Sequence, residues 1–354
     1  MEELWLNNTA RKSVIRCGDG AFRAYMPQHK GESLFVVTDR NVMAYYEQLL
    51  LDICGEDACI CVLPAGESSK SMRNLKKILD AMCEAQLKRN SRVVAFGGGV
   101  VGDIAGLAAS LYMRGINLTQ VPTTLLAQVD SSVGGKTAID YNDVKNLVGA
   151  FYQPDEVIVD PLFLQTLPKR EVKCGLGEIV KYAGIDAGIF DALMGWPEKT
   201  FPLDFLSALT MDCIRHKARV VESDERDSGG DRKSLNMGHT TGHAFELYYK
   251  YMSHGEFVMI GMYFELYIAR ALGICTGPYA DDLERLIMKA ERKIPFLDNV
   301  REAAAKAKTD KKNDSSGTIS VILPVSKGEW TEKKIPAGEY MDLIEKCGKE
   351  AWAL

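Results

Sequence analysis

The first half of the chain alternates short apolar runs, rich in β-branched residues, with segments of helical length. The runs occupy residues 34–38, 60–64, 93–96, 118–121 and 157–159, and helix-length segments such as residues 71–87 separate them. Runs this short and this rich in valine and isoleucine are typical of buried strands. Their alternation with helices predicts a parallel sheet covered by helices, with ligands bound beyond the carboxyl ends of the strands.

The second half of the chain has a different pattern. From about residue 169 it is largely helical, as in residues 270–273 and 281–293, with one late β-like run at residues 318–323. A chain of 354 residues also exceeds the usual size of a single core. We therefore predict an α/β N-terminal domain with a Rossmann-like parallel sheet at residues 1–165. A mostly α-helical C-terminal domain follows at residues 166–354, and the two are joined near residues 161–167.

A glycine-rich turn follows the third apolar run. Residues 97–103 read GGGVVGD, and residues 104–111 continue as an apolar, alanine-rich helix. Glycines between a strand and a helix let the backbone approach a pyrophosphate, whose charge then meets the helix N-terminus. The turn is not the GxGxxG fingerprint, and tight turns need glycine for backbone reasons alone. It indicates a nucleotide site only together with other evidence.

Three of the five histidines fall between residues 235 and 256. His239 and His243 are four residues apart, so on a helix they project from one face. His254 can return to the same place after the short polar stretch of residues 249–253. The cluster predicts a metal centre, and the plain alternative is a packed or solvated helix face. A metal on the helical domain and a nucleotide on the α/β domain would meet in the cleft between them.

Composition and charge indicate what kind of protein this is and where in the cell it works. The hydrophobic share of 46% and the charged share of 26% are those of an ordinary soluble protein, and the net charge of -5 argues against nucleic acid as the main partner. The nine cysteines form no CxxC pair and are scattered, which favours a reducing compartment. The acidic N-terminus does not read as a signal peptide, and no apolar run reaches membrane-spanning length. We expect a cytoplasmic protein without membrane partners.

Seven ordered segments carry a resemblance to a known family. They are residues 97–103, 121–126 (VPTTLL), 130–137 (DSSVGGKT), 145–147 (KNL), 177–181 (GEIVK), 236–239 (NMGH) and 254–256 (HGE). Together they resemble the 3-dehydroquinate synthase family, in the family's order, from about residue 38 to residue 312. The resemblance implies the dehydroquinate synthase-like fold, which is the two-domain arrangement predicted above.

The resemblance also implies a reaction. Enzymes of this family convert 3-deoxy-D-arabino-heptulosonate 7-phosphate to 3-dehydroquinate and phosphate in the shikimate pathway. The implied order is oxidation of a secondary alcohol, elimination of phosphate, reduction of the ketone, ring opening and intramolecular aldol closure. The implied cofactors are a tightly held NAD, recycled in each turnover, and one divalent metal, zinc or else cobalt. The phosphorylated sugar acid is the implied substrate, and a homodimer is the implied assembly.

The family pattern gives the histidines different roles, whereas their spacing alone suggests that His239 and His243 both bind the metal. The implied metal ligands are Glu178, His239 and His254, and His243 is expected beside the substrate as a proton-transfer group. Two nitrogens and one carboxylate leave coordination positions open, and an open metal can chelate the hydroxyls of a substrate.

The implied NAD contacts lie mostly in the first half of the chain. They are Asp39, Asn41, Glu67, Lys70, Gly98, Gly99, Val100, Asp103, Thr123, Thr124, Lys145, Thr166 and Leu167. An acid after an early strand is where a ribose hydroxyl is usually held. From its local sequence, Asp39 is equally a simple turn residue.

The implied substrate residues include several cations, which suit a phosphate and a carboxylate. They are Asp130, Lys136, Asn146, Lys181, Lys217, Arg232, Asn236 and either Lys311 or Lys312, with Arg114 reaching the phosphate in a partner subunit. Without the resemblance, Lys217 and the late lysine pair read as solvated surface.

One visible departure from the family pattern is Thr241, a polar residue where the family usually has an apolar one. The loop from His243 to His254 is also slightly short.

Three other functions compete with the one that the resemblance implies. The first is another sugar phosphate cyclase, such as 2-deoxy-scyllo-inosose synthase or a valiolone-type cyclase. The second is a metal-dependent polyol dehydrogenase, which would release NADH. The third is a zinc-stabilised binding module, whose metal site would be closed by four protein ligands.

Overall fold

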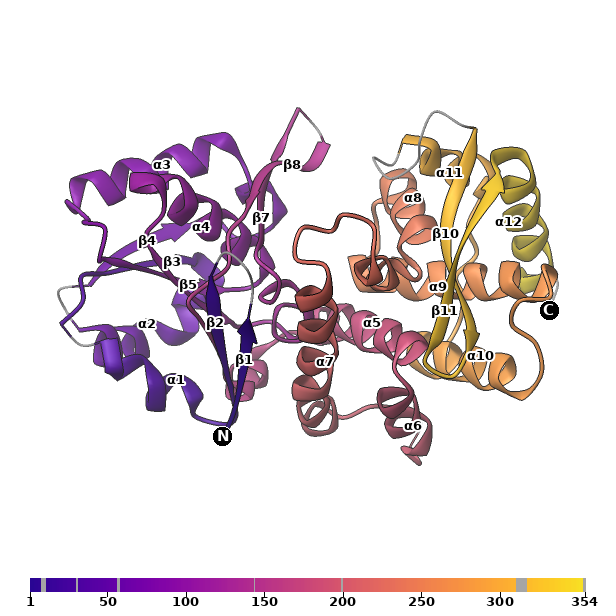
Figure 1. The fold of residues 1–354 in the computed structure, drawn as a ribbon, viewed down its shortest axis with the longest axis horizontal. Helices are drawn as coiled ribbons and strands as arrows, with labels where there is room; N and C mark the ends of the chain where they lie inside the picture. The colour runs from indigo at the N-terminus through magenta and orange to yellow at the C-terminus, as the bar shows by residue number, and fades with distance from the viewer. Residues whose placement is uncertain are drawn as a thin grey trace. The chain divides into compact units, whose positions relative to one another are not determined.

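The computed structural model describes residues 1–7, 11–29, 31–55, 58–142, 144–198, 200–309 and 317–352 (Figure 1). The chain divides into two compact units. The first contains Met1–Pro168 and Lys217–Arg226, and the second contains Lys169–His216 and Asp227–Leu354. The sequence did not predict the return of Lys217–Arg226 to the first unit. The predicted domain boundary between residues 165 and 166 concerns which segments fold independently, and it stays a prediction.

The first unit is built on a seven-stranded sheet in the order β1-β2-β9-β6-β5-β3-β4. Its strands are β1 (Glu2–Asn7), β2 (Lys12–Cys17), β3 (Leu34–Asp39), β4 (Cys59–Leu63), β5 (Arg92–Gly97), β6 (Asn117–Pro122) and β9 (Glu156–Val159). All neighbours pair in parallel except β1 and β2, which form an antiparallel edge. The five predicted runs are all strands of this sheet, whereas β1 and β2 were not predicted.

The order of the strands contains a topological switch point. After β3 the chain moves to β4 on one side, and then crosses to β5 on the other side of β3. In open parallel sheets a ligand binds at such a reversal, outside the carboxyl ends of the strands. Here the two strands at the switch end at Asp39 and Gly97, so the glycine turn stands where a nucleotide is expected.

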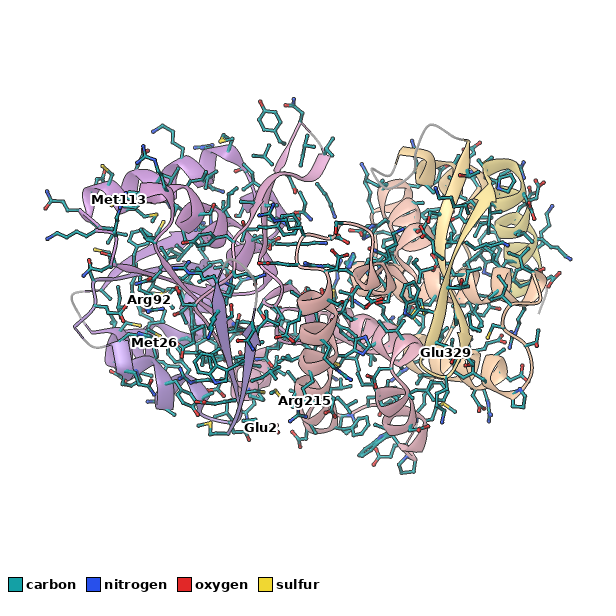
Figure 2. All side chains as sticks on the ribbon, in the orientation of Figure 1. Glu2, Met26, Arg92, Met113, Arg215 and Glu329 are labelled. Atoms are coloured by element: carbon teal, nitrogen blue, oxygen red, sulfur yellow. The ribbon has the colours of Figure 1, made fainter. Side chains whose placement is uncertain are left out.

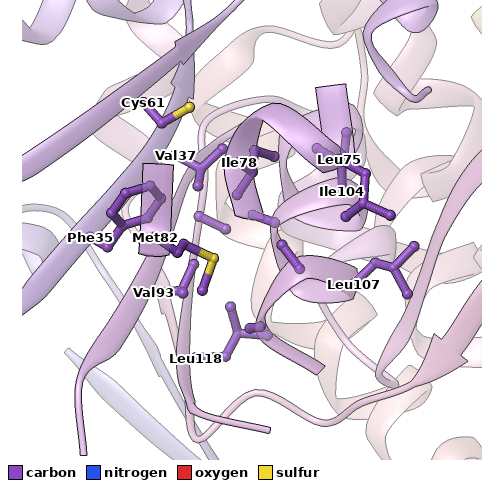
Figure 3. Packing of buried hydrophobic residues seen from close by; sticks show 14 of the residues in the cluster. Phe35, Val37, Cys61, Leu75, Ile78, Met82, Val93, Ile104, Leu107 and Leu118 are labelled. Atoms are coloured by element: carbon purple, nitrogen blue, oxygen red, sulfur yellow. The ribbon is translucent and has the colours of Figure 1, made fainter. Parts of the chain in front are cut away.

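Helices cover both faces of this sheet because its buried strands are apolar on both sides. Phe35 and Val37 of β3 face α3 (Met72–Glu84) and α4 (Gly99–Leu111), in the packing shown in Figure 3. Leu34 and Val36, the alternate residues of the same strand, pack with α1 (Ala21–Tyr25) and α2 (Arg40–Cys54). This two-residue alternation is the geometry of a pleated strand.

Two further elements complete the first unit. The hairpin of β7 (Lys136–Tyr141) and β8 (Val144–Phe151) is a separate two-stranded sheet, and it was not predicted. The helix α7 (Leu203–Ser223) crosses from the second unit into the first. Its C-terminal half packs Ala218 and Val221 against Leu6 of β1, which explains why this distant segment belongs to the first unit.

The second unit is mostly helical, as predicted. Its helices are α5 (Lys169–Ile185), α6 (Ala187–Gly195), the first part of α7, α8 (His239–Tyr249), α9 (His254–Ala271), α10 (Pro278–Glu291), α11 (Val300–Ala305) and α12 (Ala337–Trp352). The β-like run at residues 318–323 is part of β10 (Thr318–Ser326), which pairs antiparallel with β11 (Glu329–Pro336). Figure 2 labels Glu329 at the start of β11. In the segments that the structure describes, no helix has the length and apolar character needed to span a membrane.

Candidate dinucleotide turn and metal centre

The residues predicted to contact NAD gather at the carboxyl ends of the parallel strands. Asp39 ends β3 and Asn41 follows it. Glu67 and Lys70 follow β4, Gly98, Gly99, Val100 and Asp103 follow β5, Thr123 and Thr124 follow β6, and Thr166 and Leu167 follow β9. Lys145 lies on β8 instead. Because parallel strands end at one edge of the sheet, residues far apart in sequence are brought to one place.

The glycine turn is closely packed by its neighbours. A Cβ atom on Gly98 would lie 2.9 Å from the methyl carbon of Thr124, and one on Gly99 would lie 3.0 Å from Oγ of Ser131. Gly98 is also the N-cap of α4, and no described side chain caps this helix. The turn therefore needs glycine for close approach, and it leaves the N-terminal amides of α4 to meet an anion.

A buried cation joins three of the predicted residues. Nζ of Lys70 lies 2.7 Å from Oδ2 of Asp103 and also donates to the side-chain oxygen of Asn146. Lys70 is only 5% exposed. Burial opposes the charge of Lys70, but Asp103 and Glu67 outweigh it and raise its pKa. The structure thus brings together two predicted NAD contacts and one predicted substrate contact.

Asp39 fulfils the structural role that its local sequence allowed. One carboxylate oxygen, Oδ1, accepts the N–H groups of Asn41 and Val42 at 2.8 and 3.1 Å, which makes Asp39 the N-cap of α2. A cap of this kind uses one oxygen of the carboxylate. Capping and a contact to ribose are therefore compatible, and the ribose contact stays a prediction.

Asp130 sits in an unusual local structure. Residues Ala127–Ser131 form a π-helical turn, which is rare and occurs mostly as single turns at functional sites. Lys217 of α7 donates to the backbone oxygen of Asp130 at 2.5 Å and lies 3.1 Å from its carboxylate. Lys217 is 5% exposed, so it is not the solvated surface residue that its local sequence suggests.

The candidate metal centre lies in the second unit, where α5, α8 and α9 meet. Oε1 of Glu178 lies 3.5 Å from Nε2 of His239 and 3.2 Å from Nε2 of His254. One ring nitrogen from each of His239, His243 and His254 also lies within 4.8 Å of the others. A carboxylate oxygen and imidazole nitrogens are ligands that zinc and cobalt accept, so these residues fit the implied metal.

Opposite charges lie close together in this centre. Burial opposes ionisation of Glu178, but Lys181, His239 and His254 outweigh it and hold the pKa of Glu178 well below its usual range. Nζ of Lys181 lies 2.5 Å from Oε2 of the same carboxylate. Burial lowers the pKa of His239. An ionised Glu178 and a neutral His239 are the forms that bind a metal. Burial opposes the charge of His254, but Glu178 and Glu246 outweigh it and raise its pKa to about 10, so metal binding there displaces a proton.

Close helix packing determines where the ligands lie. A Cβ atom on Gly177 would lie 2.2 Å from the carbonyl oxygen of Gly255, and one on Gly255 would lie 1.9 Å from that of Cys174. These glycines are the neighbours of Glu178 and His254. The backbones of α5 and α9 therefore approach closely beside the two ligands, which no larger residue would allow.

Sequence reasoning missed two carboxylates behind the histidines. Glu246 contacts the ring of His254, with Oε2 3.0 Å from Nδ1. Glu265, which is fully buried, accepts the N–H groups of Gly238 and Thr241 at 2.6 and 3.1 Å and so caps the start of α8. The spacing of Glu246, three residues after His243, is a signal that points to the same face of the helix.

Thr241 has a local explanation for its polarity. Its side chain is buried and its hydroxyl lies 2.9 Å from the hydroxyl of Tyr340 on α12. A buried hydroxyl is tolerated when it has a hydrogen-bond partner. The departure from the family pattern is therefore accommodated within the second unit.

The remaining predicted substrate residues are divided between the units. Lys181 and Arg232 are buried in the second unit, where Asn236 ends the short helix Asp231–Asn236. Lys136 begins β7 in the first unit and is exposed. Arg114 is exposed and has a φ of 66°, next to Met113 with a φ of 48° (Figure 2). Lys311 and Lys312 lie outside the described residues.

The fold and the site together define a class of protein. Its members join a dinucleotide-type parallel sheet to a helical unit that carries a candidate divalent-metal centre. Residues 60–174 match the model for the N-terminal part of 3-dehydroquinate synthase, and residues 175–313 match the model for the C-terminal part. The 3-dehydroquinate synthase of Alkaliphilus metalliredigens is 40% identical over 339 residues, which cover 94% of this chain and 95% of that protein. The chain belongs to the 3-dehydroquinate synthase family.

Two solved structures show the same fold. A 2-deoxy-scyllo-inosose synthase, complexed with carbaglucose-6-phosphate, NAD+ and Co2+, has a TM-score of 0.84 and 23% identity, over 98% of this chain and 99% of that one. The 2-epi-5-epi-valiolone synthase ValA of Streptomyces hygroscopicus subsp. jinggangensis, with NAD+ and Zn2+ bound, has a TM-score of 0.83 and 25% identity, over 98% of both chains. The predicted family and fold class are confirmed.

Proposed function

We propose that this chain is a 3-dehydroquinate synthase, which converts 3-deoxy-D-arabino-heptulosonate 7-phosphate to 3-dehydroquinate and phosphate. The observation that carries the proposal is the convergence of Glu178, His239 and His254 in a chain that is 40% identical to a 3-dehydroquinate synthase over nearly its whole length. An enzyme of this kind is a lyase. Its reaction breaks a carbon–oxygen bond and releases phosphate.

NAD and one divalent metal are the cofactors of the proposed reaction, in agreement with the ligands of the two structural neighbours. When bound, NAD supplies a transient hydride acceptor and the metal supplies Lewis acidity to the hydroxyls of the substrate. The residues at the carboxyl ends of the strands, from Asp39 to Leu167, would hold NAD. Glu178, His239 and His254 would hold the metal, with zinc as the first candidate and cobalt as the second.

His243 is the proposed proton-transfer group. It lies one helical turn after His239, and the centres of the two rings are 5.0 Å apart. An imidazole exchanges protons near neutral pH, which suits it to move a proton to or from the substrate. Because its ring also lies close to those of His239 and His254, replacing each histidine separately distinguishes proton transfer from metal binding.

The proposed substrate contacts suit an anion with two charged groups. In the second unit, Lys181 and Arg232 are buried cations, and Asn236 adds an amide. In the first unit, the proposed contacts are Asp130, Lys136, Asn146 and Lys217. Cations held in fixed positions bind phosphate and carboxylate and orient the reacting carbons.

We further propose a homodimer in the cytoplasm. Strand β8 exposes an apolar set of side chains, namely Val144, Leu147, Val148 and Phe151. Exposed apolar strands of this kind favour association. Arg114 is exposed, next to the left-handed backbone of Met113, so it is available for a contact to the phosphate in a partner subunit. Light scattering tests the assembly, and a stable, fully active monomer would refute it.

The decisive experiment measures phosphate release by the purified protein. The substrate is 3-deoxy-D-arabino-heptulosonate 7-phosphate, with catalytic NAD and zinc, and with or without a chelator. We expect turnover that yields dehydroquinate and stops with the chelator, and the His239→Ala variant serves as a metal-site control. Absence of phosphate release by protein that retains NAD and metal would reject the substrate. Glucose 6-phosphate and sedoheptulose 7-phosphate would then test the related cyclase activities.

A further inference from the structure

Both ring nitrogens of His254 face carboxylates. Nε2 lies 3.2 Å from Oε1 of Glu178, on the side of the candidate metal centre. Nδ1 lies 3.0 Å from Oε2 of Glu246, on the opposite side of the ring. An ionised carboxylate can only accept a hydrogen bond, so Nδ1 donates to Glu246. An imidazole that donates from Nδ1 can present the lone pair of Nε2 to a metal.

Glu246 is placed for this contact by the helix that carries the other histidines. It lies on α8, three residues after His243 and seven after His239. The chain then turns at Lys250, whose φ of 60° ends the helix, and α9 begins at His254. This short connection returns His254 to the face of α8 from which Glu246 projects. The side chain of Glu246 is 17% exposed.

The backbone of His254 and its ring are fixed by different groups. Ser253 and Glu256 form a capping box at the start of α9, which fixes the backbone around His254. The ring is 32% exposed, so packing alone restrains it incompletely. His239, by comparison, is 12% exposed, and its Nδ1 donates to the carbonyl oxygen of Met237 at 3.1 Å. Each proposed histidine ligand thus has an acceptor at Nδ1, and the acceptor of His254 is a carboxylate.

We propose that Glu246 is a positioning residue of the metal centre. Its carboxylate holds the Nδ1–H of His254, which fixes the ring plane and directs Nε2 toward Glu178 and His239. Carboxylates behind a metal-binding histidine orient the ring and increase its basicity, and their loss typically weakens metal affinity by 10-fold to 100-fold. The inference rests on the metal centre of the proposed function, and it adds a residue that does not itself bind the metal.

The test measures zinc affinity in the full chain without substrate. Wild type, Glu246→Gln and Glu246→Ala are loaded with zinc and titrated with a competing chelator of known affinity. We expect zinc to bind about 10-fold to 100-fold more weakly to the alanine variant. We expect a smaller loss for glutamine, because its amide oxygen can accept the same hydrogen bond without the charge. Elemental analysis of the loaded proteins should still give one metal per chain.

A matched control separates positioning from general stability. Glu302→Gln removes an exposed carboxylate that accepts a hydrogen bond from Tyr248, also on α8, at 3.0 Å. We expect this control to keep wild-type zinc affinity, and the metal-free Glu246→Gln variant to melt as wild type does. Equal zinc affinity in wild type and both Glu246 variants would overturn the positioning role alone. A wild-type protein that binds no zinc would overturn the metal centre itself.

Discussion

The Nε2 atom of His254 lies 3.2 Å from Oε1 of Glu178, although 76 residues separate the two in the chain. Glu178 comes from the middle of α5 and His254 from the first residue of α9. The contact exists because the two helices approach closely at Gly177 and Gly255, the residues next to this pair. The geometry of the candidate metal centre therefore depends on backbone packing as much as on the ligands.

Replacing each histidine separately should distinguish ligands from the proton-transfer group. We expect His239→Ala and His254→Ala to lose the metal, because each removes one of the nitrogens that face Glu178. We expect His243→Ala to keep the metal and to lose turnover by about 100-fold to 10,000-fold, the usual contribution of a general acid or base. Elemental analysis after dialysis gives the metal content. Loss of metal in the His243 variant would make His243 a ligand.

A methyl group at the helix contact should disturb the second unit. In Gly255→Ala, the new Cβ would lie 1.9 Å from the carbonyl oxygen of Cys174, so α5 and α9 must move apart. We expect a loss of at least about 2 kcal/mol in the free energy of unfolding, as for overpacked cores. Urea unfolding of the metal-free protein measures it. The control is Gly195→Ala, whose new Cβ would have no neighbouring atom within 4 Å, so its stability should change little. Equal stability of the two variants would contradict this account.

The ion pair of Lys70 and Asp103 should be energetically coupled. Lys70→Met leaves the Asp103 carboxylate, which is 19% exposed, without the cation 2.7 Å away. Removing one partner of a buried pair typically costs about 3 to 5 kcal/mol. We expect a loss near the lower end, and a smaller loss in the Lys70→Met, Asp103→Asn double variant than the sum of the single losses. Denaturant unfolding of all four proteins gives the coupling, and strictly additive losses would refute it.

Glu265 should make stability depend on pH. Burial raises the pKa of Glu265 from its ordinary 4.5 to about 7 in the folded protein, despite the hydrogen bonds from Gly238 and Thr241. The folded state therefore binds this proton more tightly than the unfolded chain. Its contribution to stability is complete below pH 4.5 and is lost as pH rises through about 7.

The Glu265→Gln variant isolates this contribution. Between pH 5 and pH 8 we expect the free energy of unfolding of wild type to fall by about 2 kcal/mol more than that of the variant, because the pKa of Glu265 is raised in the folded state. Urea unfolding at several pH values measures the difference. Parallel pH profiles for the two proteins would show that the folded-state pKa of Glu265 is not raised.

The sequence alone predicted the elements whose local pattern is strong. The five buried strands, the glycine turn and the helix bearing His239 and His243 follow from apolar periodicity and spacing, which act within a few residues. The antiparallel pair of β1 and β2 and the hairpin of β7 and β8 were missed. The residues of β1 and β8 are largely exposed, so the apolar pattern that marks a buried strand is absent there. β2 and β7 are more buried, but polar residues interrupt their apolar ones, as in KSVIRC and KTAIDY.

The tertiary structure decided which distant residues meet. The burial of Lys217 against Asp130, the contact of Glu246 with His254 and the cap that Glu265 provides for α8 each join separate elements. No local pattern specifies such contacts, because they depend on where helices stop and how closely their backbones pack. The sequence determined the chemical groups available to this protein, and long-range packing decided which of them lie within hydrogen-bonding distance.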